Sequence, residues 1–211
     1  AQLFALKFNL SPDSIKTLSA LLHEIERHKG HLSTGIFSTK YLFDVMRLND
    51  SNEIAYEIAN QREYPGWGHM LERNATTLWE TWALPETGAS RNHPMFGSID
   101  EWFYRSLLGI NNNGVAFDKI IIKPQPAGDL KFAKGSYNSV RGLIESNWIK
   151  MDNYFNQLVT IPPNTKAEIW VPYTQGDKVW EKQNIPVARY EKGYAVFQTG
   201  SGNYSFMAEK P

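Results

Sequence analysis

Cysteine is absent from this chain of 211 residues, which excludes disulfides, thiolate metal ligands and cysteine nucleophiles. Neither charge is in excess, because 22 Lys and Arg residues balance 22 Asp and Glu residues, and no basic run stands out. Nucleic acid and membranes are therefore not expected as partners. No stretch approaches the roughly 18 consecutive apolar residues of a membrane span. No signal peptide is visible, and the compartment stays open between periplasm, extracellular space and cytoplasm.

Aromatic residues, by contrast, are abundant. They make up 13% of the chain, and four of the seven tryptophans fall in one short segment: Trp67, Trp79, Trp82 and Trp102. The chain opens with "AQLFALKFNL" and has no initiator Met. This opening is typical of the end of an apolar helix, so we expect the chain to be a piece of a longer protein whose missing N-terminal part is its partner.

The first half of the chain has the apolar periodicity of helices. A helix is predicted after Ser11 as N-cap, with Gly30 at its C-terminal end. Two more are predicted after Ser38 and Ser51, and a fourth in "GSIDEWFYRSLLGI", with Trp102 on its apolar face. The loops between them are rich in Gly, Trp, His and polar residues, which plain helical bundles do not need. Such loops indicate a scaffold that carries function on its connections.

The second half changes to an apolar period of two. It holds several short segments of this kind separated by turn signals: "FDKIIIK", "SYNSVRGLIESNW", "NQLVTI", "AEIWVPY", "YAVFQT" and "NYSFMA". This pattern predicts an antiparallel β-sandwich. The fold class is therefore α then β, in two modules, with a helical segment over residues 1–116 and a β-sandwich over residues 117–211.

One carboxylate, Glu80, stands between Trp79 and Trp82 in "TTLWETW". If this stretch is helical, Glu80 points away from the apolar face and is an ordinary solvent-exposed residue. The alternative is a carboxylate that faces a cavity rimmed by tryptophans, which suits sugars because their rings present flat apolar faces. Trp67, between two glycines, is a candidate for the same surface, whereas Trp102 is expected in the core.

His93 follows in the polar loop "SRNH", where it either caps a turn or binds a ligand. Asn and His side chains can hold sugar hydroxyls, so Asn92 is also a candidate. His69 and His93 have no metal-ligand spacing, and neither a metal nor a cofactor is expected.

The succession of "GHLSTGIFSTKYLFDV", "YPGWGHMLERNATTLWETW", "SRNHPMFGSIDEWFYRSLLGI" and "SGNYSFMA" resembles the C-terminal part of bacterial α-L-rhamnosidases. The resemblance covers nearly the whole chain and keeps the family's order. It implies the end of an (α/α)6 barrel followed by a C-terminal β-sandwich. It also implies cleavage of terminal α-L-rhamnose with inversion, which requires two carboxylic residues.

Carried over residue by residue, the resemblance assigns the general base to Glu80. It assigns sugar contacts to His93 and, less directly, to Trp67, with Trp79 and Asn92 as neighbouring substrate-binding candidates. Glu86 and Glu101 are the next carboxylates to consider. The family's general acid lies in an upstream segment that does not occur here, and about four helices are too few for a complete barrel. The 211 residues alone are therefore expected to be inactive.

Two other hypotheses remain open. The chain could be a non-catalytic module that binds carbohydrate or packs against another domain. It could also belong to another inverting glycosidase, or to a lyase, on a related helical barrel.

Overall fold

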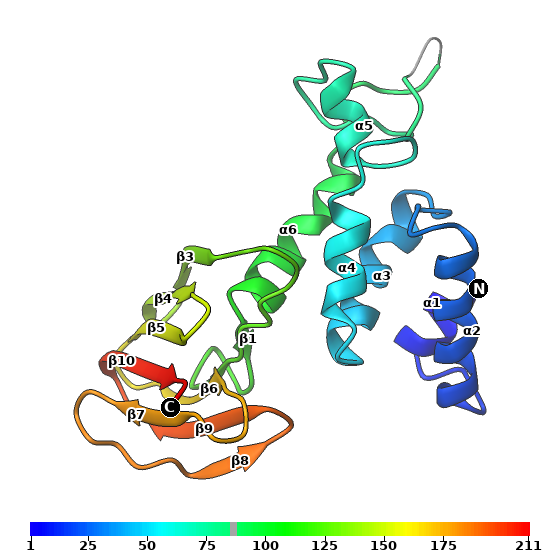
Figure 1. Ribbon diagram of the computed structural model, residues 1–211. Coiled ribbons are helices and arrows are strands. Elements are labelled where there is room, and N and C mark those ends of the chain that lie inside the picture. The colour runs from blue at the N-terminus through cyan, green and yellow to red at the C-terminus, as the bar shows by residue number, and fades with distance from the viewer. Residues whose placement is uncertain (85–87) are drawn as a thin grey trace. The chain divides into compact units, whose positions relative to one another are not determined.

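The computed structural model describes residues 1–84 and 88–211 and divides them into two compact units (Figure 1). The first, Ala1–Trp102, is helical, and the second, Phe103–Pro211, consists mainly of strands. The predicted fold class of helices followed by a mainly antiparallel β-structure is confirmed.

Among its described residues, the helical unit contains six α-helices of unequal length. Their bounds are α1 (Gln2–Lys7), α2 (Ser14–Arg27), α3 (Ile36–Leu48), α4 (Asn52–Ala59), α5 (Trp67–Glu72) and α6 (Ile99–Trp102). A 3-10 helix, Pro94–Ser98, leads into α6. Helix α3 is central, because it packs against α1, α4 and α6 and buries a continuous run from Leu42 to Met46. The predicted core position of Trp102 is confirmed, since only 4% of it is exposed.

Two of the predicted helix starts are wrong. Helix α2 begins after Asp13, whose carboxylate accepts a hydrogen bond from the Lys16 amide at 3.0 Å, and not after Ser11. Helix α3 begins after Gly35, three residues before the predicted N-cap Ser38. In both cases more than one residue that favours the N-cap position lies within a few positions of the helix start, so the sequence alone does not decide which of them precedes the first turn. Ser51 does precede α4, as predicted.

A charged cluster joins α1 to α3. Asp44, 9% exposed, accepts hydrogen bonds from the Lys7 ammonium and from the Arg47 guanidinium, the latter at 2.6 Å. Burial alone would raise the pKa of the Asp44 carboxyl, but the two cations outweigh it and hold that pKa below its ordinary value. Asp44 is therefore ionised at neutral pH and fixes α1 on α3.

The second unit consists of two five-stranded sheets. One has the order β1-β2-β6-β9-β8 and the other β3-β4-β5-β10-β7. The strands of the first sheet are β1 (Ile110–Asn112), β2 (Lys119–Ile122), β6 (Lys166–Pro172), β8 (Arg189–Glu191) and β9 (Tyr194–Thr199). Those of the second are β3 (Phe132–Ser139), β4 (Gly142–Lys150), β5 (Tyr154–Ile161), β7 (Lys178–Glu181) and β10 (Gly202–Glu209). All neighbours pair antiparallel except β2 and β6, which are parallel.

The core of this unit is a cluster of buried apolar side chains from both sheets. Trp148, Phe206, Phe197 and Ile169 are each at most 1% exposed. Their alternation along the strands explains the period of two in the sequence, because successive side chains point to opposite faces of a sheet.

Along the sequence, the boundary between the two units falls after Trp102, whereas the sequence predicted a division at residue 117. The segment just after Trp102, a π-helical turn over Phe103–Leu107, leads into backbone that belongs to the sandwich. The Trp148 indole donates to the Leu107 carbonyl and the Ser146 hydroxyl to the Leu108 carbonyl, both at 2.7 Å. Sequence periodicity follows side chains, so it does not detect a segment that joins a domain through its carbonyls.

Candidate functional site

The segment that carries Glu80 is not helical, so the helical interpretation of "TTLWETW" is wrong. Between α5 and the 3-10 helix at Pro94, the described residues form turns, bends and extended backbone. The reason is that Glu80 and His93 donate their backbone N–H groups to carbonyls across the segment and not to the preceding turn. The Glu80 amide donates to the Ser90 carbonyl at 2.9 Å, and the His93 amide donates to the Leu78 carbonyl at 2.8 Å.

Two side-chain bonds complete this junction between residues 77–80 and 90–93. The Glu80 Oε2 atom accepts a hydrogen bond from the Ser90 amide at 2.8 Å, and the Thr77 hydroxyl donates to the Arg91 carbonyl. Glu80 is half-buried. The junction brings the backbone of the "TTLWE" stretch and that of the "SRNH" loop side by side, which neither motif alone predicts.

A cluster of aromatic rings follows the junction in the chain and packs around Trp82, two residues after Glu80. Trp82 stacks on Phe96 with ring centroids 3.6 Å apart, and its indole donates to the Thr34 carbonyl at 2.6 Å. Trp67 meets the Trp82 ring edge to face at 4.9 Å and also contacts Phe43 at 5.6 Å. Such pairs add stability beyond their buried area and fix ring orientation. The Glu80 segment is therefore anchored to α3, α5 and the 3-10 helix.

Trp67 is the first residue of α5, although the sequence placed it on an exposed loop. Its indole donates to the Phe96 carbonyl at 3.2 Å, and the side chain is half-buried. The glycine that follows is required by packing, because a Cβ at Gly68 would lie 2.3 Å from the Gln61 carbonyl oxygen. Gly68 in "PGWGHM" thus allows the start of α5 to pass close to the backbone at Gln61. Trp67 as a sugar contact stays a prediction.

His93 lies at the entrance of the 3-10 helix and is half-buried. Its Nδ1 accepts a long hydrogen bond, 3.4 Å, from the Met95 amide. A neutral ring that accepts at Nδ1 carries its proton on Nε2, which is then the donor that a ligand hydroxyl would meet. Capping and ligand binding therefore do not exclude each other at His93. The neighbouring Asn92 is exposed, and its amide N–H donates to the Ser90 hydroxyl at 3.0 Å.

The remaining predicted residues have different surroundings. Trp79 is 3% exposed, so its ring offers little surface to a ligand, and its sugar contact stays a prediction. Glu101 forms an ion pair with Lys40, with the charged atoms 3.5 Å apart. Glu86 lies outside the described residues.

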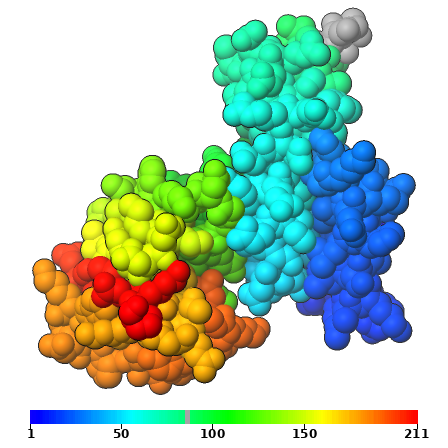
Figure 2. Space-filling model, in the orientation of Figure 1, coloured from blue at the N-terminus to red at the C-terminus, as the bar shows by residue number. Residues whose placement is uncertain are grey.

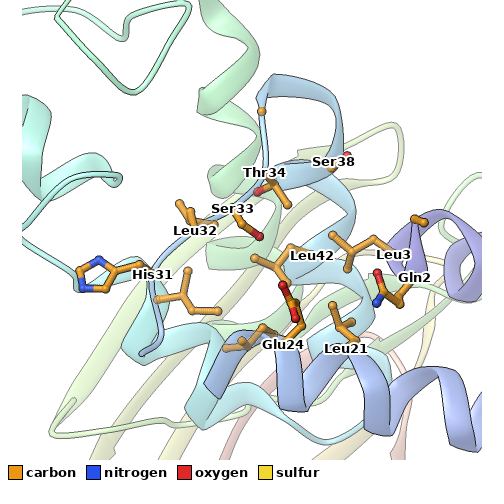
Figure 3. A pocket seen from close by; sticks show the side chains of 14 residues that line it. Gln2, Leu3, Leu21, Glu24, His31, Leu32, Ser33, Thr34, Ser38 and Leu42 are labelled. Atoms are coloured by element: carbon orange, nitrogen blue, oxygen red, sulfur yellow. The ribbon is translucent and has the colours of Figure 1, made fainter. Parts of the chain in front are cut away.

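A cavity of about 200 Å³ lies beside the loop that includes Thr34, between the ends of α1, α2 and α3 (Figure 3). Glu24, His31 and Ser33 are among its polar lining residues. Hydrogen bonds from Arg27, and then from His28, lower the pKa of Glu24 to about 2, although partial burial opposes them. A carboxyl with such a pKa holds no proton at neutral pH.

Within residues 1–84 and 88–211, no group of three or more His, Asp or Glu side chains could hold a metal ion. None of the helices described is long and apolar enough to cross a membrane.

Sequence reasoning missed the residues that build the junction. Ser90 and Thr77 lie inside the quoted motifs, but their part depends on pairing between two irregular stretches, for which periodicity gives no signal. Thr34 and Phe96 are distant in sequence and contribute a carbonyl and a ring.

Two family descriptions match the chain. Residues 1–107 match the bacterial alpha-L-rhamnosidase 6 hairpin glycosidase domain, and residues 109–186 match the bacterial alpha-L-rhamnosidase C-terminal domain. Together they cover the helical unit and most of the strand unit, up to residue 186.

Solved structures and curated relatives agree with this match. The chain is similar to the structure of an α-L-rhamnosidase from Dictyoglumus thermophilum, with 42% identity and a TM-score of 0.93, covering 100% of this chain and 25% of that one. It is also similar to the Streptomyces avermitilis α-L-rhamnosidase solved in complex with L-rhamnose, with 32% identity and a TM-score of 0.91, covering 98% of this chain and 21% of that one. An Alteromonas α-L-rhamnosidase is 34% identical over 182 residues, which are 82% of this chain and 20% of that protein. The chain thus spans about a fifth to a quarter of the relatives it matches.

Proposed function

The chain belongs to the bacterial α-L-rhamnosidase family, and from this we propose that it is part of an enzyme that removes terminal α-L-rhamnose from glycosides. The single observation that carries the proposal is the junction of the "TTLWE" and "SRNH" stretches around Glu80. Family membership favours rhamnose over the sugar of another inverting barrel glycosidase. The substrate would be a rhamnose-containing glycoside or polysaccharide.

In the proposed mechanism, the Glu80 carboxylate is the general base that removes a proton from the attacking water. The Ser90 amide donates to one carboxylate oxygen, Oε2, and so fixes the plane of the group. Among the described residues Oε1 accepts no hydrogen bond, which leaves it for the water. Attack from the face opposite the leaving group inverts the anomeric carbon.

The general acid would come from residues beyond these 211, in the longer protein. The share of the relatives that this chain spans supports this division. In an inverting enzyme the acid would stand across the sugar at a carboxyl separation of about 6.5–9.5 Å. His93 Nε2 would donate to a rhamnose hydroxyl, with Asn92 and the Trp67 ring as further contacts.

The proposal is tested by Glu80→Gln in the longer protein that contains this chain. Since a general base contributes about 10²–10⁴-fold, kcat on an aryl α-L-rhamnoside should fall by that factor while rhamnose still binds. Glu72→Gln is the matched control, because Glu72 is an exposed carboxylate that pairs with Arg62. Full activity of the Glu80→Gln variant would remove Glu80 from the mechanism. Proton NMR of the first product reports stereochemistry, and the β-anomer is expected.

His93 has its own test, designed to separate binding from capping. His93→Ala should raise KM more than it lowers kcat. His93→Asn keeps a side-chain acceptor near the Met95 amide but lacks the imidazole donor, so it should restore the melting temperature without restoring KM. An unchanged KM in both variants would count against the sugar contact.

The 211 residues alone should show no turnover of the same substrate, since they would supply a base without an acid. A rate near that of an ordinary glycosidase would overturn the assignment of the acid to another part of the protein.

A further inference from the structure

A second hollow, unrelated to the Glu80 junction, lies in the strand unit at one end of the sandwich. Its volume is about 630 Å³, within the range of roughly 300–1,000 Å³ that is usual for ligand pockets. Both sheets contribute to it through the β4–β5 turn, the segment after β6, the start of β9 and the end of β10. The final segment of the chain, red in Figure 2, is part of the surface on the visible side of this unit.

The lining combines rings with hydrogen-bonding groups. Tyr154 and Tyr173 are half-buried and border the hollow, while Phe155 and Ala208, 6% and 3% exposed, belong to the core at its base. The Tyr173 ring is held against that of Tyr190, with centroids 4.9 Å apart. Partly exposed, fixed aromatic rings are the surfaces on which the apolar faces of sugar rings pack.

Three lysines surround the same hollow: Lys131, Lys150 and Lys210. All are exposed, and no ion pair joins any of them to another residue of the described ranges. Other lysines of the unit are engaged, since Lys123 lies over the Trp170 ring at 4.7 Å and Lys178 over the Trp180 ring at 5.3 Å. The lysines at the hollow are therefore available to an external anion.

Two carboxylates line the hollow as well, Asp152 and Asp177. The Asp177 carboxylate accepts a hydrogen bond from the Thr174 backbone amide at 2.7 Å, so one of its two oxygens is already engaged within the protein. Three ammonium groups against two carboxylates leave a formal charge of 3 − 2 = +1.

From the hollow, its rings and its unpaired lysines, we propose that the strand unit binds an anionic saccharide, one whose sugar rings carry carboxylate or sulfate groups. Tyr154 and Tyr173 pack against the sugar rings, and the three lysines hold the acidic groups through charge-assisted hydrogen bonds. This site would hold an acidic polysaccharide close to an enzyme of the proposed type. It stands independently of Glu80.

The test is binding by the whole 211-residue chain, measured by affinity electrophoresis and calorimetry with polygalacturonate, a sulfated dextran, neutral dextran and poly-L-glutamate. The two acidic polysaccharides should bind, more weakly as salt rises, because exposed charges are screened. Binding to polygalacturonate alone assigns the acidic group as carboxylate, and binding to sulfated dextran alone assigns it as sulfate. Neutral dextran bound equally well would overturn the role of the lysines. Poly-L-glutamate bound equally well would overturn the saccharide.

Two sets of variants make the result specific. Replacement of Lys131, Lys150 and Lys210 by Gln should weaken saccharide binding about tenfold or more, since hydrogen bonds to charged groups exceed neutral ones in strength. The same change at Lys134, Lys166 and Lys182, exposed lysines of the unit outside the hollow, is the control for net charge. An equal loss in both triple variants would overturn the site.

Tyr173→Ala should weaken saccharide binding and leave the affinity for poly-L-glutamate unchanged, whereas Tyr173→Phe should keep both. Circular dichroism melts of each variant check the fold. If the wild-type chain binds neither acidic polysaccharide, the proposal fails whatever the fate of Glu80, and Glu80→Gln should leave this binding intact.

Discussion

The Glu80 segment and the β-sandwich hold their shapes by different means. Between α5 and the 3-10 helix, a few hydrogen bonds join residues 77–80 to 90–93, and Trp82 anchors the segment through one stack and one indole bond. The sandwich is stabilised by continuous hydrogen-bonded strand pairing and by an apolar core to which both sheets contribute. Loss of one contact should therefore act locally in the first region and cooperatively in the second.

The difference matches what each region has to present. If Glu80 and His93 act on a ligand as proposed, their side chains must stay accessible, and both lie half-buried on irregular backbone that neighbouring rings and hydrogen bonds hold in place. Rigid support for such groups comes from neighbouring packing and hydrogen bonds. The core of the sandwich, by contrast, is made up of apolar side chains from both sheets, which need no access to a ligand.

The largest expected effect comes from the sandwich core. Phe206 is fully buried and packs against Phe197 with centroids 4.9 Å apart. Phe206→Ala should destabilise the strand unit by about 3–5 kcal/mol, because the cavity is added to the lost transfer energy. Urea unfolding followed by near-UV circular dichroism measures this, with Leu158→Ala, 48% exposed on the next strand, as control. Hydrogen exchange should rise throughout the strand unit. A rise confined to β10 would show that the sandwich is not cooperative.

The local counterpart is Trp82→Phe. It removes the indole donor from the partly buried Thr34 carbonyl and reduces the ring area stacked on Phe96. Since an unpaired acceptor that is fully buried costs about 1–3 kcal/mol, we expect a loss toward the lower end of that range. Exchange should rise in residues 77–84 and 88–93 while the strand unit stays protected. Leu84→Ala, 41% exposed in the same segment, should change neither. Unchanged exchange around Glu80 would mean that the hydrogen bonds across the junction suffice without the Trp82 anchor.

This contrast also explains which features the sequence could predict. The strands of the sandwich and the core position of Trp102 follow from periodicity, because regular backbone places side chains at fixed intervals. The shape of the Glu80 segment does not follow, since it depends on bonds between residues far apart, such as Trp82 to Thr34. The candidates Glu80 and His93 came from the resemblance of the motifs, and periodicity alone would have placed Glu80 on a solvent-facing helix.

A third test concerns charge in the helical unit. The pKa of Asp44 is lower in the folded state, so its contribution is present above the ordinary carboxyl pKa of about 3.9 and is lost as pH falls through the lowered value. Asp44→Asn should cost about 1–3 kcal/mol at pH 7, because Lys7 and Arg47 lose a charged acceptor. The difference from wild type should shrink below about pH 4. Urea midpoints from pH 3 to 7 measure it. A difference constant with pH would assign the effect to packing alone.

The smallest effect is expected for the corresponding pair of the strand unit. Arg189 donates to both oxygens of Glu168, each at 3.0 Å, and these bonds hold the Glu168 pKa below its ordinary value despite partial burial. The side chains are 29% and 37% exposed, so water and salt screen the pair more than they screen Asp44. Glu168→Gln should cost at most about 1 kcal/mol at pH 7, and less in high salt. The same urea and pH series measures it. A loss as large as that of Asp44→Asn would show that the pair is structurally required, and the two units would then depend on charge alike.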